Sequence, residues 1–557
     1  MTPAVHPVAR VLNLVHLERK EIATIYLYAI LSGLIQLSLP VGIQAIIGFV
    51  LGGAMVASLA ILIGLVVLGV LFTGMLQIGQ MEITEKIQQK IFLRYTYLFA
   101  DRIPRLSLEK TDRYYLPELV NRYFEIPTLQ KGLAKLLLEI PTALIQILFG
   151  LVLLSLYHSS FILFGLLLIL ILWLILHYSG IRGLRASLAE SHYKYTTGAW
   201  LEEMARHVKT FKFSKGSAIG ARKADEQATG YLKHRNEHFG VLKWQFRVLV
   251  AFKVIITAAM LIVGSLLLVN QQLNIGQFVA AEIVIITLIG SVEKLIGNLE
   301  TVYDVLTAVD KLSAMTEAPV EEEGTRPLES PPGGLRLEAG RLRFAYPDQE
   351  PVLEEATFHI SPGQWVCIRG EEGSGKSTLL RLMSGAYRAY EGTFTIDRLP
   401  PGNFESGSLR SRMGILLQQQ DIFQGTLWEN VTMGHADIRL EEITDLFHGL
   451  GLDDYLASLP KGLDTPLDPM GNRLPRSVVL KLLLVRALAG RPALLLLEDP
   501  WLGMHASYRR QVIRLLRAKY PRTTVVIATQ DLEFAGEADQ VLEIHQRKIK
   551  ALTWKKN

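Results

Sequence analysis

The sequence is poor in cysteine and, over long stretches, in charged residues. Cys367 is the one cysteine among 557 residues, so no disulfide can form within the chain. No group of histidine, cysteine and acidic residues has metal-ligand spacing, and there is no Ser-His-Asp arrangement. Lysine and arginine do not form patches interleaved with aromatic residues, so nucleic acid is not an expected partner.

The first residues lack the continuous apolar core of a cleaved signal peptide. Residues 1–22 instead predict a short amphipathic helix that leads into an apolar run, with a frayed tail as the alternative. Apolar residues are in excess further along. They make up 50% of the chain, and the mean hydropathy of +0.26 is too high for an ordinary soluble protein of this length. The net charge of +5 fits loops beside an anionic membrane surface.

Six apolar runs are long enough to cross a membrane as helices, which takes about 20 residues each. The run 51–80 contains no charged residue. The run 140–181 is equally free of charge and is twice as long as one span requires, and the polar residues YHSS (157–160) divide it. The predicted spans are 23–50, 51–80, the two halves of 140–181, 248–270 and 274–297.

The distribution of lysine and arginine predicts how these spans are oriented. The long connections 81–135 and 181–247 are rich in both residues, whereas the short connections 157–160 and 270–276 contain neither. The long connections and both termini are therefore predicted to be cytoplasmic. Helical periodicity persists in LEEMARHVKTFKF (201–213), so the spanning helices are expected to continue into the cytoplasm.

The composition changes around 316–335, where TEAPVEEEGTRPLESPPGGL has the acidic, proline-rich and glycine-rich character of a linker. It separates a predicted membrane domain, 23–315, from a predicted nucleotide-binding domain, 336–557. After the linker, RLEAGRLRFAY, EATFHI and QWVCIRG are typical of strands, and KSTLLRLMSGA is typical of a helix. This alternation predicts an α/β domain.

A phosphate-binding motif lies in this second part. Residues 370–378, GEEGSGKST, match G-x-x-x-x-G-K-[ST] between a predicted strand and a predicted helix. Glycines let backbone N–H groups wrap around phosphates, the lysine reaches the terminal phosphates, and the serine binds Mg²⁺. The alternative is a glycine-rich turn without function. The candidate residues are Gly370, Gly373, Ser374, Gly375, Lys376, Ser377 and Thr378.

Six spans with long cytoplasmic extensions, followed by this motif, resemble an ABC transporter subunit of the exporter type over nearly the whole chain. The resemblance implies an all-α six-helix transmembrane domain followed by an α/β P-loop nucleotide-binding domain. It also implies ATP and Mg²⁺ as cofactors, a homodimer or heterodimer through both domains, and the inner membrane as location. The membrane half is most similar to type I secretion and peptide exporters, which adds a periplasmic adaptor as a possible partner.

The resemblance also implies roles for residues outside the phosphate motif. An aromatic residue about 25 positions upstream stacks on adenine in the family, and Tyr346 in RFAYPDQEPVL fits. A glutamine that contacts the metal and the attacking water corresponds to Gln418. With Ser377 and Glu498, Gln418 forms the implied Mg²⁺ set. The segments 118–130 and 190–205 occupy places where family members dock on the ATP-binding domain; a solvated helix is the alternative.

The sequence departs from the family at its signature, Leu-Ser-Gly-Gly-Gln. The corresponding residues are Leu474-Pro475-Arg476-Ser477-Val478. In the family, these groups close over the γ-phosphate held by the other subunit. Pro475 has no N–H to offer. Arg476 brings bulk where the backbone must approach closely, although a guanidinium can bind phosphate.

Three further departures concern catalysis. The family's Asp-Glu pair is reversed to Glu498-Asp499, so a shorter carboxylate stands where water is activated. The family's Ser-Ala-Leu-Asp loop is replaced by Leu502-Gly503-Met504-His505. The switch histidine is Gln530, which can donate a hydrogen bond but cannot become cationic. An alignment error of one residue at the acidic pair is the alternative reading.

The combined pattern predicts that nucleotide binding is kept and that hydrolysis is slow or absent, with ATP acting as a conformational clamp. In a dimer with a normal partner, each of the two sites would carry one defect. The expected cargo is a protein, a peptide or a lipidic molecule. One alternative is a non-transporting regulatory or scaffold protein built on the exporter fold. A third option is a proton-coupled device that uses Glu282, an ionisable residue inside the sixth span, unless Glu282 lies at the interface.

Overall fold

The computed structural model describes residues 7–52, 57–111, 116–215, 218–329, 333–418, 420–471 and 473–552. The chain forms two compact units. The first, called the helical unit below, comprises Met1–Pro104 and Tyr114–Ala318. The second, called the nucleotide unit, comprises Arg105–Arg113 and Pro319–Asn557. Residues 1–6 of the predicted amphipathic segment and 330–332 of the predicted linker lie outside the described residues.

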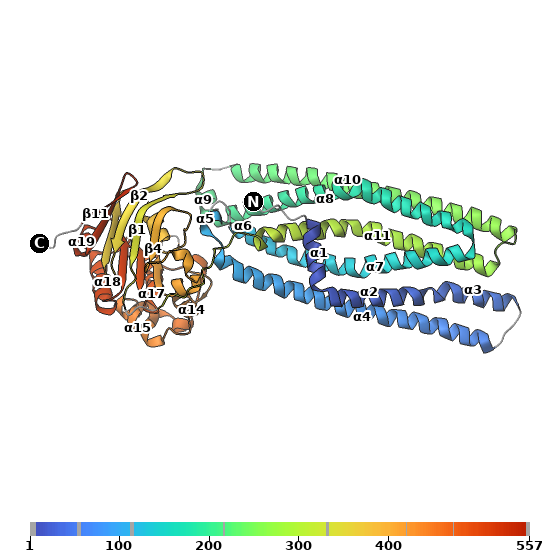
Figure 1. The fold of residues 1–557 in the computed structure, drawn as a ribbon, viewed down its shortest axis with the longest axis horizontal. Helices are drawn as coiled ribbons and strands as arrows, with labels where there is room; N and C mark the ends of the chain where they lie inside the picture. The colour runs from blue at the N-terminus through green and yellow to red at the C-terminus, as the bar shows by residue number, and fades with distance from the viewer. Residues whose placement is uncertain are drawn as a thin grey trace. The chain divides into compact units, whose positions relative to one another are not determined.

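The helical unit is built from long helices that pack in antiparallel pairs, α2 with α4, α7 with α11, and α8 with α10 (Figure 1). A short helix, α1, contacts α11 and α2 near the middle of the long helices. The helices are α1 (Pro7–Leu17), α2 (Arg19–Gln36), α3 (Ser38–Leu51), α4 (Ala57–Arg102), α6 (Leu116–Asn121), α7 (Ile126–Tyr157), α8 (Ile162–Arg206), α9 (Val208–Phe213), α10 (Ile219–Val269) and α11 (Ile275–Thr316).

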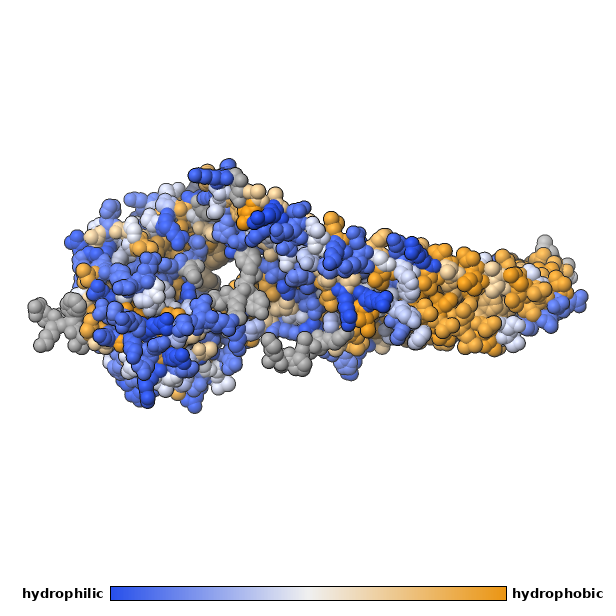
Figure 2. Space-filling model, turned by 90° about the horizontal axis from the view of Figure 1, so that it is seen from above, coloured by the Kyte–Doolittle hydropathy of each residue, from blue (hydrophilic) through white to orange (hydrophobic). Residues whose placement is uncertain are grey.

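Among the described residues, six helical stretches are long and apolar enough to cross a membrane, which confirms the six predicted spans. Figure 2 shows hydrophobic residues covering the surface of one end of these helices and polar residues covering the other end. Helices suit a membrane because each backbone N–H and C=O group can be hydrogen-bonded within its own helix. The predicted break at YHSS is also confirmed, since α7 ends at Tyr157 and His158 is extended.

The helices continue far beyond the apolar runs, as predicted from their periodicity. α10 has 51 residues and α8 has 45, about twice what a bilayer requires. Ion pairs stabilise the polar ends of the helices. The Arg10 guanidinium of α1 lies 3.2 Å from Asp310 Oδ1 and 2.8 Å from Glu317 Oε2, both near the end of α11.

The nucleotide unit contains a six-stranded sheet in the order β11-β10-β3-β9-β8-β5, parallel except for the β10–β11 pair. An antiparallel sheet, β2-β1-β4, and a short pair, β6-β7, complete the strands. The strands are β1 (Leu337–Ala345), β2 (Pro351–Ile360), β3 (Trp365–Gly370), β4 (Glu391–Ile396), β5 (Met413–Leu416), β6 (Gly425–Thr426), β7 (Pro466–Leu467), β8 (Leu494–Glu498), β9 (Thr524–Ala528), β10 (Gln540–His545) and β11 (Lys548–Leu552).

Helices of the nucleotide unit include α5 (Leu108–Thr111), α12 (Lys376–Met383), α13 (Ser406–Arg410), α14 (Leu427–Thr432), α15 (Leu440–Gly449), α16 (Asp453–Ser458), α17 (Arg476–Leu488), α18 (Ala506–Lys519) and α19 (Leu532–Glu537). The predicted strands and the helix after the phosphate motif match β1, β2, β3 and α12. The segment Arg105–Arg113 belongs to this unit although it precedes helices of the other. Its Glu109 carboxylate accepts a 2.9 Å hydrogen bond from the Ala389 N–H.

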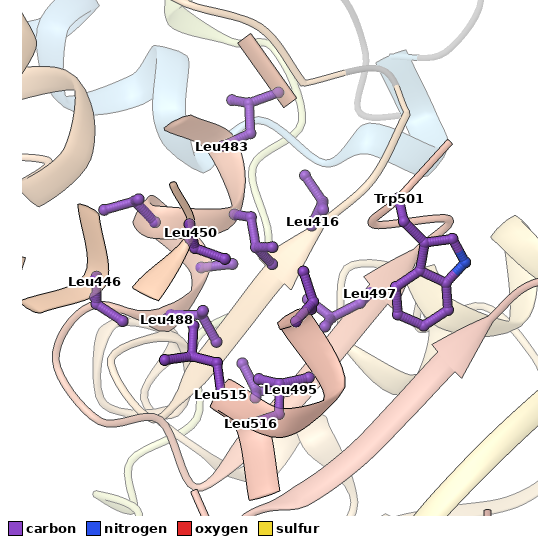
Figure 3. Close-up of a cluster of buried hydrophobic side chains, with 14 of the residues drawn as sticks. Leu416, Leu446, Leu450, Leu483, Leu488, Leu495, Leu497, Trp501, Leu515 and Leu516 are labelled. Carbon is purple, nitrogen blue, oxygen red and sulfur yellow. The ribbon is translucent and has the colours of Figure 1, made fainter. Parts of the chain in front are cut away.

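The central strands are hydrophobic on both faces, as expected for parallel strands covered on both sides. All four leucines of β8, Leu494 to Leu497, are fully buried. Figure 3 shows Leu495 and Leu497 among leucines from α15, α17 and α18, with Trp501 at the edge of the cluster. Burial of each such side chain stabilises the fold by about 1.5–3 kcal/mol. This packing fixes the carboxyl end of β8, where the acidic pair lies.

Candidate nucleotide-binding site

The phosphate motif forms a loop between β3 and α12. Gly373 and Gly375 have left-handed φ angles of +77° and +102°, which glycine adopts without a steric penalty. A Cβ atom on Gly375 would lie 2.8 Å from Val352 Cγ1. Gly375 is the residue that precedes the first turn of α12, so the backbone amides at the start of this helix face the loop.

Some polar side chains of this loop have hydrogen-bond partners and others have none among the described residues. Lys376 Nζ donates to the carbonyl oxygens of Gly370 at 2.8 Å and Glu371 at 2.7 Å. The Ser374 hydroxyl is buried and has no hydrogen-bond partner among the described residues. A buried hydroxyl without a partner is costly, and a phosphate oxygen would satisfy it. The residues present therefore fit a bound nucleotide phosphate.

Glu498, the first residue of the acidic pair, contacts the phosphate motif. The Ser377 hydroxyl donates a short hydrogen bond to Glu498 Oε1, and the Gln418 backbone N–H donates to Glu498 Oε2 at 3.0 Å. Glu498 thus stands beside the hydroxyl predicted to bind Mg²⁺, and it is 9% exposed. Oxygen ligands of this kind suit Mg²⁺. The exposed Gln418 side chain makes no hydrogen bond with the described residues.

The second acidic residue, Asp499, occupies a different environment. Its φ is +40°, a conformation that costs energy for a residue other than glycine. Its backbone N–H donates to the Ala528 carbonyl at 2.9 Å. Burial raises the pKa of the Asp499 carboxyl, repulsion from Glu498 adds to this, and a hydrogen bond from Thr529 opposes it. The strand-end geometry therefore holds Asp499 close to β9.

Gln530 follows β9 and reaches the same loop. Its Nε2 donates a short hydrogen bond to the Gly370 carbonyl, so the side chain is already engaged with the phosphate loop. The sequence reasoning missed the residues that fix this segment. Arg509 of α18 pairs with Asp531 and Glu533, and Asp531 Oδ1 accepts 2.9 and 3.2 Å hydrogen bonds from backbone N–H groups at the start of α19. An aspartate directly before an apolar helical run is the signal that would have found it.

Tyr346, the predicted adenine-stacking residue, lies at the end of β1. Its hydroxyl is 3.0 Å from Thr378 Oγ1, and Arg381 Nη1 donates to it at 3.2 Å. The rings of Phe344 and Tyr387 pack edge-on against it, at centroid distances of 5.2 and 5.8 Å. The half-buried ring is therefore held next to the end of the phosphate motif, and its stacking on adenine stays a prediction.

The altered signature forms the start of α17. Pro475 is the N-cap, and Arg476 and Ser477 are the first two helical residues, all exposed. Arg476 Nη1 lies 3.8 Å from Asp421 Oδ1. Among the described residues, no hydrogen bond or ion pair joins these three to the phosphate loop. The structure therefore brings Lys376, Ser377, Glu498 and Gln530 together and leaves the signature apart.

Two charged residues lie on membrane-spanning helices of the helical unit. Glu282, singled out from the sequence, lies in the third turn of α11, half exposed, and makes no hydrogen bond with the described residues. Lys253 of α10 has its Nζ 2.5 Å from Glu293 Oε2 of α11, which neutralises both charges.

Comparison with known families identifies both parts of the chain. Residues 22–292 match the ABC transporter transmembrane region, and residues 353–501 match the ABC transporter domain. The ATP-dependent lipid A-core flippase of Burkholderia orbicola is 29% identical over 281 residues, 50% of this chain and 47% of that protein. A probable multidrug resistance ABC transporter ATP-binding/permease protein, YheH, of Bacillus subtilis is 33% identical over 236 residues, 42% of this chain and 35% of that protein.

The chain thus spans about half or less of the length of these curated relatives. The fold has a close structural counterpart. The structure of a bacterial Atm1-family ABC exporter with ATP bound superposes with a TM-score of 0.82, covering 96% of this chain and 95% of that one at 19% identity. This likeness establishes the fold, a six-helix membrane region followed by an α/β nucleotide-binding domain. With the two family matches, it establishes that the chain is a multi-pass membrane protein belonging to the ABC transporters of the exporter type.

Proposed function

We propose that this chain is a transporter subunit that binds ATP and Mg²⁺ at its phosphate loop, hydrolyses ATP slowly or not at all, and uses bound ATP to hold one conformation. Lys376 and the amides at the start of α12 would hold the phosphates, and Tyr346 would stack on adenine. Ser377, Gln418 and Glu498 would hold Mg²⁺, which would neutralise phosphate charge.

The observation that carries the proposal is the contact between Ser377 and Glu498. It supports reading Glu498 as the metal-side carboxylate, which leaves Asp499 as the residue that would act on water. Aspartate is one methylene shorter than the family's glutamate. The Asp499 backbone N–H is also hydrogen-bonded to the Ala528 carbonyl at the end of β9. Misplacement by about 1 Å can lower a rate about 100-fold. Gln530 and the sequence from Pro475 to Ser477 supply two further defects.

The assembly that fits these defects is a dimer, either of two copies or with a second ABC subunit. Each ATP would lie between the phosphate loop of one subunit and the signature of the other. We place the nucleotide unit and both termini in the cytoplasm of a cell bounded by an inner membrane, because the connections 81–135 and 181–247 are rich in lysine and arginine. The domain boundaries 23–315 and 336–557, a periplasmic adaptor and kinship with type I secretion exporters stay predictions.

The relatives favour a lipidic or otherwise amphipathic cargo over a folded protein. Their names describe a lipid A-core flippase and a probable multidrug resistance ABC transporter. A peptide with apolar side chains belongs to the same chemical class.

The test is to purify the full chain into lipid nanodiscs and to measure equilibrium ATP binding and ATP turnover side by side. Lys376→Ala is the control for both measurements. We expect saturable ATP binding in the parent chain and turnover no higher than in the control. Turnover well above that of Lys376→Ala would contradict the proposal, because the altered residues would then be catalytic. Binding without turnover or transport in any reconstituted pair would favour the scaffold alternative.

A further inference from the structure

The first membrane-spanning stretch, Arg19–Leu51, contains a one-residue interruption. α2 ends at Gln36 and α3 begins at Ser38, with Leu37 between them in helical backbone conformation. Pro40 explains the break, because proline has no N–H to donate to the Gln36 carbonyl and its ring crowds the preceding turn. The break leaves a backbone carbonyl without its usual partner in a region where unpaired polar groups are costly.

This break lies deep in the apolar region. Fifteen residues separate Gln36 from Leu51 at the end of α3, about 22 Å at 1.5 Å per residue. Ser291 is the seventeenth residue of α11, about 24 Å from the start of that helix. A hydrocarbon core is about 30 Å thick, so both residues lie within it, with Ser291 nearer the end of the core where Lys253 pairs with Glu293.

Polar side chains from three helices meet at this depth. The Ser291 hydroxyl of α11 lies 2.8 Å from Gln146 Oε1 of α7 and 2.9 Å from the Thr287 carbonyl oxygen of its own helix, and its one proton can be donated to either. Gln146 Nε2 donates to Gln36 Oε1 of α2 at 2.6 Å. This group of side chains ends at the Gln36 amide nitrogen, which has no hydrogen-bond partner among the described residues and retains two N–H donors.

A cavity lies at the end of this group of side chains. Its volume is about 50 Å³, and its lining includes Gly33, Gln36, Leu39, Gly150, Ile283 and Thr287. None of the described residues that line this cavity is charged. Glu282, the neighbour of Ile283, is not among the lining residues. The volume accommodates a hydroxyl or amide group, since one water requires about 10–15 Å³ by this measure.

We propose that this cavity binds an uncharged hydrogen-bonding group, such as an amide or a hydroxyl, carried on the apolar body of a transported molecule. The Gln36 N–H groups can donate to the bound group. The Thr287 hydroxyl donates to the Ile283 carbonyl at 2.9 Å and can accept through its lone pairs. Leu39 and Ile283 supply apolar contacts. Irregular backbone at membrane depth is tolerated where it is buried in protein or lines a cavity. The proposal rests on the proposed transport function and narrows its cargo to uncharged amphiphiles.

The test uses two fluorescent probes with the same acyl chain and fluorophore. One is a ceramide, which carries an amide and two hydroxyl groups without charge, and the other carries a quaternary ammonium group. Binding to the full chain in nanodiscs is measured, without nucleotide, by energy transfer from tryptophan. We expect saturable ceramide binding that is about tenfold weaker in Gln36→Met, because loss of one or two buried hydrogen bonds costs that much. We expect the cationic probe to bind less tightly than the ceramide.

The matched control is Gln77→Met, the same change at an exposed glutamine of α4 that makes no hydrogen bond among the described residues. It should leave ceramide binding unchanged. If Gln36→Met fails to fold, Thr287→Val replaces it, with an expected loss of about threefold. Equal binding in Gln36→Met or Thr287→Val and the parent, tighter binding of the cation, or no saturable binding would each overturn the cavity assignment. ATP binding, measured separately in the same samples, reports independently on the proposed function.

Discussion

The two helices that face nucleotide in this family begin very differently in this chain. α12 follows Gly375, whose left-handed φ of +102° lets the backbone fold around a phosphate. α17 follows Pro475, which has an ordinary φ of −56° and no N–H, and continues with the bulky Arg476. The proposed function therefore assigns phosphate binding to the start of α12 and a weakened closure over phosphate to the start of α17, so that the two properties can be tested separately in one domain.

The largest effect is expected from a substitution in the phosphate loop before α12. In Lys376→Ala, the loop loses its one ammonium group, and charge-assisted hydrogen bonds to phosphate contribute about 1.5–3 kcal/mol each. We expect ATP affinity to fall by roughly 10- to 100-fold in equilibrium binding to the full chain. Lys461→Ala, at an exposed loop of the same unit, should bind ATP as the parent does. Unchanged affinity in Lys376→Ala would mean that ATP is held elsewhere.

A variant that restores the family's residues at the acidic pair and the switch position tests whether those positions limit hydrolysis. In the triple variant Glu498→Asp, Asp499→Glu and Gln530→His, the longer carboxylate returns to the water-activating position and the switch regains an imidazole. We expect steady-state ATP turnover to rise at least about tenfold. The same triple change combined with Lys376→Ala should stay inactive. If the repaired chain is no faster, the signature at α17 is the dominant defect.

The ion pairs of Arg509 should give a moderate loss of stability. Arg509→Ala leaves Asp531 without its cation while Asp531 still caps α19, at a cost of roughly 1–2 kcal/mol for this partly exposed pair. A fall in Tm of roughly 3–6 °C is expected for the unit concerned, measured on the full chain. Arg510→Ala, exposed on the same helix, is the control. A fall of the same size in both variants would show that loss of charge, rather than the pairing, is responsible.

The smallest effect concerns Asp499 and depends on pH. Burial raises the pKa of this carboxyl, so ionisation is more costly in the folded chain than in the unfolded chain. The destabilising contribution is therefore absent below the unfolded pKa of 3.8 and fully present above the folded pKa. Asp499→Asn should raise Tm by a few degrees at pH 7, and the gain should shrink as the pH falls toward 4. A gain that is constant with pH would contradict the burial argument.

Much of the fold was predictable because its signals are local. Uncharged runs such as 51–80 mark the spans, and a strand, glycine-rich loop and helix mark the phosphate site around Lys376. Glu498 could also be assigned from its place after a buried leucine run, and its contact with Ser377 supports that register. These inferences rest on neighbours in sequence, where periodicity and motif spacing carry the information.

The remainder depends on residues far apart in sequence. Gln36 and Gln146 are separated by 110 positions, and each alone is an ordinary polar residue in an apolar helix. Arg509 and Asp531 meet only because α18 and β9 pack in the same unit. The grouping of Arg105–Arg113 with the nucleotide unit likewise could not be predicted from the order of residues along the chain. Tertiary contacts of this kind leave no periodic trace.

The most direct test of the central claim is a single-turnover measurement. The full chain in nanodiscs is loaded with ATP labelled at the γ-phosphate and Mg²⁺, freed of excess nucleotide, and sampled over time for intact ATP and free phosphate. Binding without hydrolysis predicts that label leaves the protein as intact ATP, with phosphate release no faster than in buffer. Release of labelled phosphate from the protein before ATP dissociates would contradict the clamp and show that Glu498, Asp499 and Gln530 still catalyse.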